Sequence, residues 1–467
     1  TLKQFVRESG EFFVIFSHFD NKSWQQKTLK VERELRKRRD IAERRPLFNF
    51  YILVSNASEL RAKIDSVKGE PHAAVIPFSF EELLGCKDKN ELTECILTRF
   101  GEYYFENNML GENDAIDDDN LLFGDRGKIA DAVVARCHQG SNSGIFGLRR
   151  SGKTSVLNAV LRRLDWEGTP YVLVESRTYE TFSSWKSVLF EIACLARARV
   201  QGIEREEDES LSQFHARLNL TSSEEEYEKR GVACFIDDMR RYLGDNLLVI
   251  ALDEIELITY NTATSETWKN LESYKGFWSA LRGCGCPLVV CGVNSTINEV
   301  SNLTFNDEQC DNPMYGRITN CSEYNETYLP AFTDEQTKAM INTLGQYSNI
   351  AFSNVYVQIN NAFGGQPWAI RQFCSYVFDH VKAQREFTRI YEVSKATCEN
   401  LMRQFQNSSA GVHLCETILQ HLSIYRSEYS LLKKIALAPE KYSTISGEDA
   451  ISIDHLQKYG LIEHDID

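Results

Sequence analysis

The chain has 467 residues, more than one hydrophobic core usually organises, so its size indicates roughly two to four domains. Hydrophobic residues make up 42% and charged residues 25%, a balance that excludes global disorder. The net charge of −15 excludes a surface that attracts nucleic acid everywhere, so any such contact needs a local basic patch.

The 13 cysteines are scattered through apolar segments, as at Cys194 and Cys374, where a free thiol behaves as a small hydrophobe. This usage favours a reducing, cytoplasmic setting. Cys284, Cys286 and Cys291 adjoin a buried-strand pattern without a second ligand pair at zinc spacing, so we expect no metal there. Because no apolar run reaches the roughly 18 residues of a membrane helix, we expect no membrane partner.

Residues 1–110 predict a small α/β unit, because strand and helix patterns alternate along them. The expected strands lie at 11–17, 48–55 and 73–78, and the expected helices at 27–45 and 58–67. Acidic residues interrupt the basic run within 27–45 at helical spacing, which favours a solvated helix face over a nucleic-acid patch.

An acidic stretch at 111–120 marks a domain boundary, and residues 121–330 then alternate apolar strands with amphipathic helices. Near-continuous apolar strands predict a parallel sheet that helices cover on both faces. These strands are expected at 144–146, 171–175, 247–252 and 287–292. The acidic segment at 204–230 is interpreted as a solvated helical insertion.

The spacing of apolar residues becomes helical over 331–410, which predicts a helical lid. A Gly-Gly-Gln-Pro break at 364–367 opens a long helical segment over 368–384. Residues 411–467 predict three short helices and a strand at 461–463, the pattern of a winged helix.

A phosphate-binding motif lies at 147–154, where Gly-Leu-Arg-Arg-Ser-Gly-Lys-Thr comes after a predicted strand and matches Gly-x4-Gly-Lys-Ser/Thr. The glycines let successive N–H groups face the phosphates, Lys153 reaches the β and γ phosphates, and the Thr154 hydroxyl ligates Mg²⁺. The expected cofactors are therefore ATP or ADP with Mg²⁺. The residues predicted to bind them here are Gly147, Arg149, Arg150, Ser151, Gly152, Lys153, Thr154 and Ser155.

Two carboxylates come directly after the buried strand at 247–252. Asp253 is predicted to hold Mg²⁺ together with Thr154, and Glu254 to polarise the attacking water, as Lys153 neutralises the phosphates. The alternative for this pair is a helix N-cap after a core strand.

Further candidates flank these motifs. Asn294 comes after the next strand, so its amide is predicted to sense the γ phosphate, with a turn-forming asparagine as the alternative. Phe123, Gly124 and Arg126 precede a helical pattern and are candidates to wrap the adenine base, with an ordinary loop as the alternative. The predicted fold class is α/β: a P-loop NTPase core with a parallel sheet, a helical lid, a C-terminal winged helix and the N-terminal unit.

In combination these segments resemble the STAND class of P-loop NTPases, relatives of AAA+ ATPases, especially the archaeal-type ATPase group found across prokaryotes. The resemblance covers about residues 121–467. The segments that carry it are Phe-Gly-Asp-Arg at 123–126, the strand and loop at 145–155, Asp-Glu-Ile-Glu at 253–256, and the segments 312–317, 328–332, 365–367 and 370–372.

The resemblance implies an ATP-dependent switch that binds and slowly hydrolyses ATP to control oligomerisation and signalling, here in prokaryotic antiviral defence. It implies nucleotide contacts from Pro367 in the lid, and cationic contacts to the γ phosphate from Arg317 and Arg371, for which surface ion pairs are the alternative. The expected partners are ATP, further copies of the chain and an unidentified protein partner or trigger. Residues 1–110 occupy the place of an effector or partner-binding module of unknown chemistry.

Two departures from the class are Asp125, where an arginine is often found, and the missing repeat array after the winged helix. One alternative function is a DNA-binding AAA+ initiator or remodelling ATPase. Nucleic acid is not favoured as a partner, because the expected recognition segment at 453–459 pairs an acid with a single lysine. Another alternative is a scaffold that binds ATP without hydrolysing it.

Overall fold

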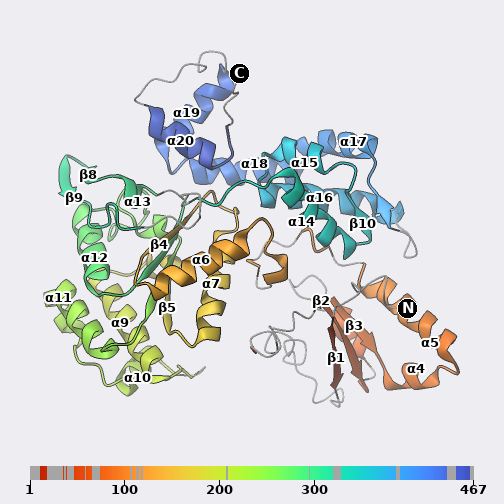
Figure 1. The fold of residues 1–467 in the computed structure, drawn as a ribbon, viewed down its shortest axis with the longest axis horizontal. Helices are drawn as coiled ribbons and strands as arrows, with labels where there is room; N and C mark the ends of the chain where they lie inside the picture. The colour runs from red at the N-terminus through yellow and green to blue at the C-terminus, as the bar shows by residue number, and fades with distance from the viewer. Residues whose placement is uncertain are drawn as a thin grey trace. The chain divides into compact units, whose positions relative to one another are not determined.

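The structure is a computed structural model with two compact units, each built from separate stretches of the chain (Figure 1). It describes residues 11–17, 35, 38, 47–57, 59–65, 74–105, 108–111, 115–116, 119–206, 209–293, 295–318, 328–384, 390–438 and 449–462. The first unit comprises 1–114, 118–124 and 332–415, and the second comprises 115–117, 125–331 and 416–467. None of the helices within these described ranges is long and apolar enough to cross a membrane.

A three-stranded parallel sheet forms the N-terminal part of the first unit, in the order β1-β2-β3. Its strands are β1 (Phe12–Ser17), β2 (Leu47–Ser55) and β3 (Ala74–Phe78), followed or joined by α3 (Leu60–Asp65), α4 (Phe80–Gly85) and α5 (Lys89–Tyr103). All three predicted strands are confirmed, and α3 lies within the helix expected at 58–67. The helix expected at 27–45 lies almost entirely outside the described residues. Phe50 of β2 is fully buried and packs edge-on against Phe100 and Tyr104.

The rest of the first unit is mainly helical. Its elements are η2 (Asp119–Leu121), α14 (Asp334–Gln346), α15 (Tyr356–Phe363), α16 (Pro367–Val381), η4 (Lys382–Gln384) and α17 (Lys395–Gln406), with a short parallel pair of β10 (Ile350–Ala351) and β11 (Tyr391–Glu392). α16 begins where the sequence predicts, because Pro367 occupies its first turn and the Gln366 side chain accepts from the Ala369 N–H. Phe363, Phe373 and Phe405 pack together between these helices.

The second unit is built around a four-stranded, wholly parallel sheet in the order β4-β7-β6-β5. Its strands are β4 (Ser143–Phe146), β5 (Tyr171–Glu175), β6 (Val249–Asp253) and β7 (Leu288–Gly292), which confirms the four predicted strands. Tyr328 extends the sheet by a parallel bridge to Phe146. Because β4 and β7 are buried along their whole length, their apolar residues run without alternation.

Helices surround this sheet (Figure 1). α6 (Arg126–His138) and α7 (Lys153–Glu167) pack together and contact β4 and β7, whereas α9 (Trp185–Gln201) contacts β5, α11 (Glu224–Leu243) and α12 (Leu271–Gly283). The remaining elements are α8 (Ser176–Tyr179), α10 (Leu211–Arg217), η3 (Ile255–Ile258), α13 (Thr296–Glu299), and the hairpin of β8 (Asn302–Phe305) and β9 (Glu308–Asp311). The sequence analysis did not predict this hairpin, whose turn residues Asn306 and Asp307 both have positive φ.

The chain ends in α18 (Ser409–Leu422), α19 (Arg426–Leu437) and α20 (Ala450–Lys458). Leu422, Tyr425 and Leu456 belong to the same hydrophobic core as the sheet of the second unit. The strand expected at 461–463 is wrong for its two described residues. Gly460 adopts φ 68°, and the Leu461 N–H donates to the Leu456 carbonyl, so the backbone there closes the helix end.

Candidate functional site

The predicted phosphate loop connects β4 to α7 in the second unit. Gly147, Arg150 and Gly152 have φ values of 150°, 67° and 98°, which turn the backbone sharply between strand and helix. The Gly147 N–H is anchored by the carbonyls of β7 and the residue after it. A Cβ on Gly147 would lie 2.8 Å from the Ser151 Oγ, so a side chain there would displace this hydroxyl and would strain a backbone at φ 150°. Gly147 and Gly152 therefore allow the tight backbone turn that the phosphate-binding motif requires, because glycine adopts positive φ at little cost.

Lys153 and Ser151 point into this loop. Lys153 is buried, and its Nζ donates to the carbonyl oxygens of Gly147 and Leu148, each at 3.0 Å. The Ser151 Oγ is buried and has no hydrogen-bond partner among the described residues. A cationic group and an orphaned hydroxyl beside the start of α7 are the features that a phosphate chain would satisfy, so the loop fits that ligand.

Thr154 and Asp253 meet at the ends of α7 and β6. The Thr154 Oγ1 donates to the Asp253 Oδ2 over 2.9 Å. Burial raises the pKa of the Asp253 carboxyl, whereas the Thr154 hydroxyl and the Lys153 ammonium oppose that rise. A hydroxyl and a carboxylate placed together beside a phosphate loop are hard oxygen donors that suit Mg²⁺.

Glu254 comes directly after Asp253 in a left-handed conformation, with φ 53°. Its carboxylate forms an ion pair with Arg177 of α8, with Nη2 to Oε2 at 3.1 Å and Nε to Oε2 at 3.2 Å. A glutamate in this backbone region costs of order 1 kcal/mol, so the surrounding structure must hold it there. The strained turn presents the carboxylate at the carboxyl end of β6, next to Asp253.

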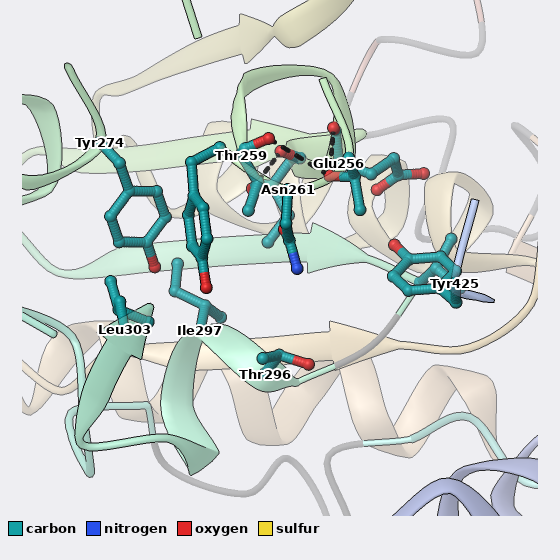
Figure 2. Close-up of a pocket in the computed structure, with 12 residues that line it drawn as sticks. Glu256, Thr259, Asn261, Tyr274, Thr296, Ile297, Leu303 and Tyr425 are labelled. Atoms are coloured by element: carbon teal, nitrogen blue, oxygen red, sulfur yellow. Dashed lines mark hydrogen bonds between the residues drawn. The ribbon is translucent and has the colours of Figure 1, made fainter. Parts of the chain in front are cut away.

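Glu256 lies two residues further and is half-buried beside the sheet. Burial raises its pKa, which the Lys153 ammonium opposes, and its Oε2 has no hydrogen-bond partner among the described residues. Glu256 and Tyr425 border one end of a pocket of about 370 Å³, part of which is open to solvent, and Tyr274 and Leu303 border the other (Figure 2). The residues lining this pocket come after the phosphate loop in sequence and include none of the loop itself.

A residue of the C-terminal helices contacts the phosphate loop. The His421 Nε2 is hydrogen-bonded to the Arg149 Nη1, and it must accept, because a guanidinium only donates. Burial, together with the nearby charges of Arg149 and Lys153, lowers the pKa of His421 to about 4. The ring is therefore neutral at pH 7 and acts as an acceptor for the arginine.

Arg126 and Ser155 support the loop from outside. The buried Arg126 Nη2 donates to the Ser151 carbonyl over 2.9 Å, and burial lowers the pKa of the guanidinium to about 9. The Ser155 Oγ accepts from the Ile116 N–H over 2.9 Å. Arg126 thus supports the phosphate loop, and its predicted contact with the adenine base stays a prediction.

The structure does not show nucleotide contacts for the other predicted site residues, four of which belong to the first unit. Phe123, Gly124, Pro367 and Arg371 belong to the first unit, where Arg371 donates to the carbonyls of the segment 109–110. Their predicted nucleotide contacts stay predictions.

Two further candidates, Asn294 and Arg317, belong to the second unit. Arg317 is exposed, and its carbonyl accepts from the Asn142 side chain. Asn294 lies outside the described residues, so its role as a γ-phosphate sensor stays a prediction.

Sequence reasoning missed three residues at the site: Arg177, His421 and Tyr425. Arg177 carries a usable signal, because it lies just after β5 and the carboxyl ends of neighbouring parallel strands converge. His421 and Tyr425 carry none, since they lie in a helical segment more than 260 residues after the loop, as the separation of 272 between Arg149 and His421 shows.

The comparisons with known proteins give structural neighbours alone. No protein-family description and no curated protein matches the sequence. Among solved structures, the chain is similar to the Walker-type ATPase of Pyrococcus abyssi, at 14% identity and a TM-score of 0.43, over 75% of this chain and 93% of that one. It is also similar to the ORC2 protein of Aeropyrum pernix, described in ADPNP and ADP complexes, at 13% identity and a TM-score of 0.35, over 76% and 90%. A functional assignment therefore has to rest on this chain's own residues.

Proposed function

We propose that this protein is an ATP-dependent molecular switch of the STAND type, which binds ATP with Mg²⁺ and hydrolyses it slowly. The observation that carries the proposal is the phosphate loop with Lys153 inside it and the Thr154 hydroxyl hydrogen-bonded to Asp253. This arrangement joins a phosphate cradle to a cation-binding carboxylate at the ends of two strands of one parallel sheet.

Each residue has a role in this proposal. The loop N–H groups and Lys153 hold the phosphates, and Lys153 exchanges its two carbonyl partners for phosphate oxygens. Thr154 and Asp253 hold Mg²⁺, which when bound neutralises charge on the phosphates. Glu254 accepts the proton of the water whose oxygen bonds to the γ phosphorus, while the bond to the ADP oxygen breaks.

The ion pair of Glu254 is one factor that would slow the proposed turnover. The carboxylate is engaged by Arg177, so it is a poor proton acceptor until that ion pair opens. A regulated ATPase needs a slow step, such as the opening of this ion pair, between ATP binding and hydrolysis. Bound ATP then persists long enough for the protein to change conformation or to assemble.

The C-terminal helices contact the nucleotide site and are the part of the protein that we propose responds to the bound nucleotide. His421 contacts Arg149 of the phosphate loop, and Tyr425 borders the same pocket as Glu256. Phosphates compete with His421 for the arginine, so nucleotide state biases the packing of residues 416–467 on the sheet domain. We propose that this change controls self-association. A role in prokaryotic antiviral defence rests on the family resemblance alone.

Light scattering tests the switch. We expect the particle to grow with ATP and Mg²⁺ but not with ADP, Lys153→Ala to block growth, and Glu254→Gln to hold the large form while phosphate release falls. Lys269→Ala, which removes an exposed lysine of the same unit, is the matched control. A size that does not change with nucleotide would overturn the switch, and salt-sensitive DNA binding in its place would favour the initiator alternative.

The defence role has its own test, which is a count of phage plaques on bacteria that carry the wild-type or the Lys153→Ala gene. Fewer plaques with the wild type alone would support it. Equal counts across a panel of phages would leave the ATPase proposal intact and remove the defence role.

A further inference from the structure

A second cluster of ligating side chains lies between α9 and α10, away from the phosphate loop. Glu191 and Cys194 are three residues apart on α9, so they share one face of that helix. His215 of α10 faces them, and the Glu191 Oε2, the Cys194 Sγ and a ring nitrogen of His215 all lie within 4.8 Å of one another. Figure 1 shows α10 beside α9 in the second unit.

The contact between Glu191 and His215 is not an ordinary hydrogen bond. The Glu191 Oε2 lies 3.1 Å from the His215 Nε2, yet this buried nitrogen has no properly directed hydrogen-bond partner among the described residues. Two ligands of one tetrahedral metal lie about 3.4 Å apart and aim at the metal and not at each other. Close approach without alignment is the geometry expected of two such ligands.

The histidine ring is held in this position by its neighbours. It packs edge-on against Phe190, with centroids 5.4 Å apart, and at a tilt against Phe214. The side chains of His215 and Glu191 are only 20% and 12% exposed. A fixed, partly buried imidazole is a better metal ligand than a mobile surface one, because less conformational freedom is lost on binding.

The surroundings carry negative charge. Burial raises the pKa of the Cys194 thiol, and the carboxylates of Glu191, Glu224 and Asp238 raise it further, so a metal that binds there has to displace the thiol proton. Asp238 is already satisfied, since its two oxygens accept from the hydroxyls of Ser222 and Tyr227. Asp238 therefore contributes electrostatic attraction and not a ligand, and the donor atoms that lie together are those of Glu191, Cys194 and His215.

We propose that Glu191, Cys194 and His215 form a Zn²⁺ site, with water as the fourth ligand, that fastens α10 to α9. One carboxylate, one thiolate and one imidazole are the mixed oxygen, sulfur and nitrogen set that suits zinc and not Mg²⁺ or Ca²⁺. The site is separate from the ATP-binding proposal, and its failure would leave that proposal unchanged.

The zinc also has a structural consequence. α10 belongs to an insertion that folds back on itself through Arg217, which forms an ion pair with Glu209 and donates to the Glu204 carbonyl. A metal bridge at His215 ties this insertion to the sheet domain through α9. Bound zinc should therefore protect the segment around residues 204–206 from proteolysis.

Cobalt and zinc titrations of the full chain, in excess Mg²⁺ and ADP, test the site. We expect one Co²⁺ per chain with a thiolate-to-cobalt charge-transfer band, which Zn²⁺ abolishes by displacement. Cys194→Ser should remove the band, and His215→Gln and Glu191→Gln should each weaken Zn²⁺ binding more than about 100-fold, beyond the effect of losing an outer-shell group. Zinc should slow proteolysis of the wild type and not of these variants.

The controls are other buried thiols. Cys234→Ser on α11 and Cys284→Ser at the end of α12 should keep the band and the affinity. Absence of the band in the wild type overturns the proposal, as does a band that survives Cys194→Ser or disappears in Cys284→Ser. Unchanged ADP affinity shows that each variant has kept its fold.

Discussion

Both compact units contain a parallel sheet, and they differ in the residues that stand at the ends of the strands. In the second unit, β4 runs into the phosphate loop and β6 ends at Asp253 and Glu254. In the first unit, β1 and β2 end at Ser17 and Ser55, and the Ser55 Oγ serves its own turn by accepting from the Ala57 N–H. The same strand architecture therefore supplies a site in one unit and a packed core in the other, because chemistry depends on the residues at the strand ends.

The largest expected effect is on the phosphate loop. Lys153→Ala should lower ATP affinity about a thousandfold, because it removes the cation that faces the phosphates. Isothermal titration calorimetry with ATP and Mg²⁺ measures the change, and Lys269→Ala should leave affinity as it is. Normal ATP binding by Lys153→Ala would contradict the proposal that the loop after β4 binds phosphate. The proposed difference between the strand ends of the two sheets would then be unsupported.

A core substitution in the first unit should act on stability and not on nucleotide binding. Phe50→Ala should destabilise that unit by about 3–5 kcal/mol, since Phe50 is fully buried. Phe16→Ala, at a residue 60% exposed on the same sheet, should cost much less. Hydrogen exchange of the strand amides reports the loss, and a fall in ATP affinity of either variant would show that the units are coupled.

The pH dependence of stability should be specific to the second unit. His455 is 2% exposed and hydrogen-bonded to Glu428 and Glu299, at 2.7 and 3.0 Å. Burial alone would lower its pKa, but the two carboxylates raise it to about 9, compared with 6.5 for an ordinary histidine. Charged His455 should therefore add about 3 kcal/mol to the free energy of unfolding below pH 6.5. This contribution should be lost as the pH rises through about 9.

Unfolding of the wild type and of His455→Gln between pH 6 and pH 10 measures this contribution. The two curves should differ most at the acid end and converge at the alkaline end. His138→Gln, which removes a surface partner of Glu167, is the matched control. Parallel curves for His455→Gln would mean that the histidine is not charged in the folded protein.

Glu254→Gln should separate binding from hydrolysis. We expect phosphate release to fall about 100-fold, the effect of losing a general base, while ATP affinity changes little. Glu266→Gln, at an exposed position of the same unit, is the matched control. Equal activity of Glu254→Gln and the wild type would remove Glu254 from the proposed mechanism.

The smallest effect concerns the partner of that glutamate. Arg177→Ala should raise phosphate release about two- to fivefold, because the ion pair is exposed and pairs of this kind hold no more than about 1 kcal/mol. Single-turnover measurements detect such a change. A fall in rate would indicate that Arg177 serves the reaction directly and does not restrain Glu254.

The fold and the site were predictable to the extent that their signals are local. The loop at 147–154 and the strands of both sheets could be identified, because glycine positions and apolar runs are readable over a few residues. The hairpin at 302–311 was not predicted, although its Asn306-Asp307 turn is a usable sequence signal. The strand expected at 461–463 was mistaken, because an apolar pair after a glycine closes a helix as readily as it opens a strand.

Contacts over long separations were decided only in the folded chain. The order β4-β7-β6-β5 places residues 147–154 beside Asp253, and tertiary packing brings Arg177 to Glu254 and His421 to Arg149. The order of motifs along the chain predicts the first pair, and the position of Arg177 just after β5 is a usable signal for the second, whereas no local pattern encodes the contact between His421 and Arg149. Residue type thus specified what chemistry the chain carries, and packing specified which of those groups meet.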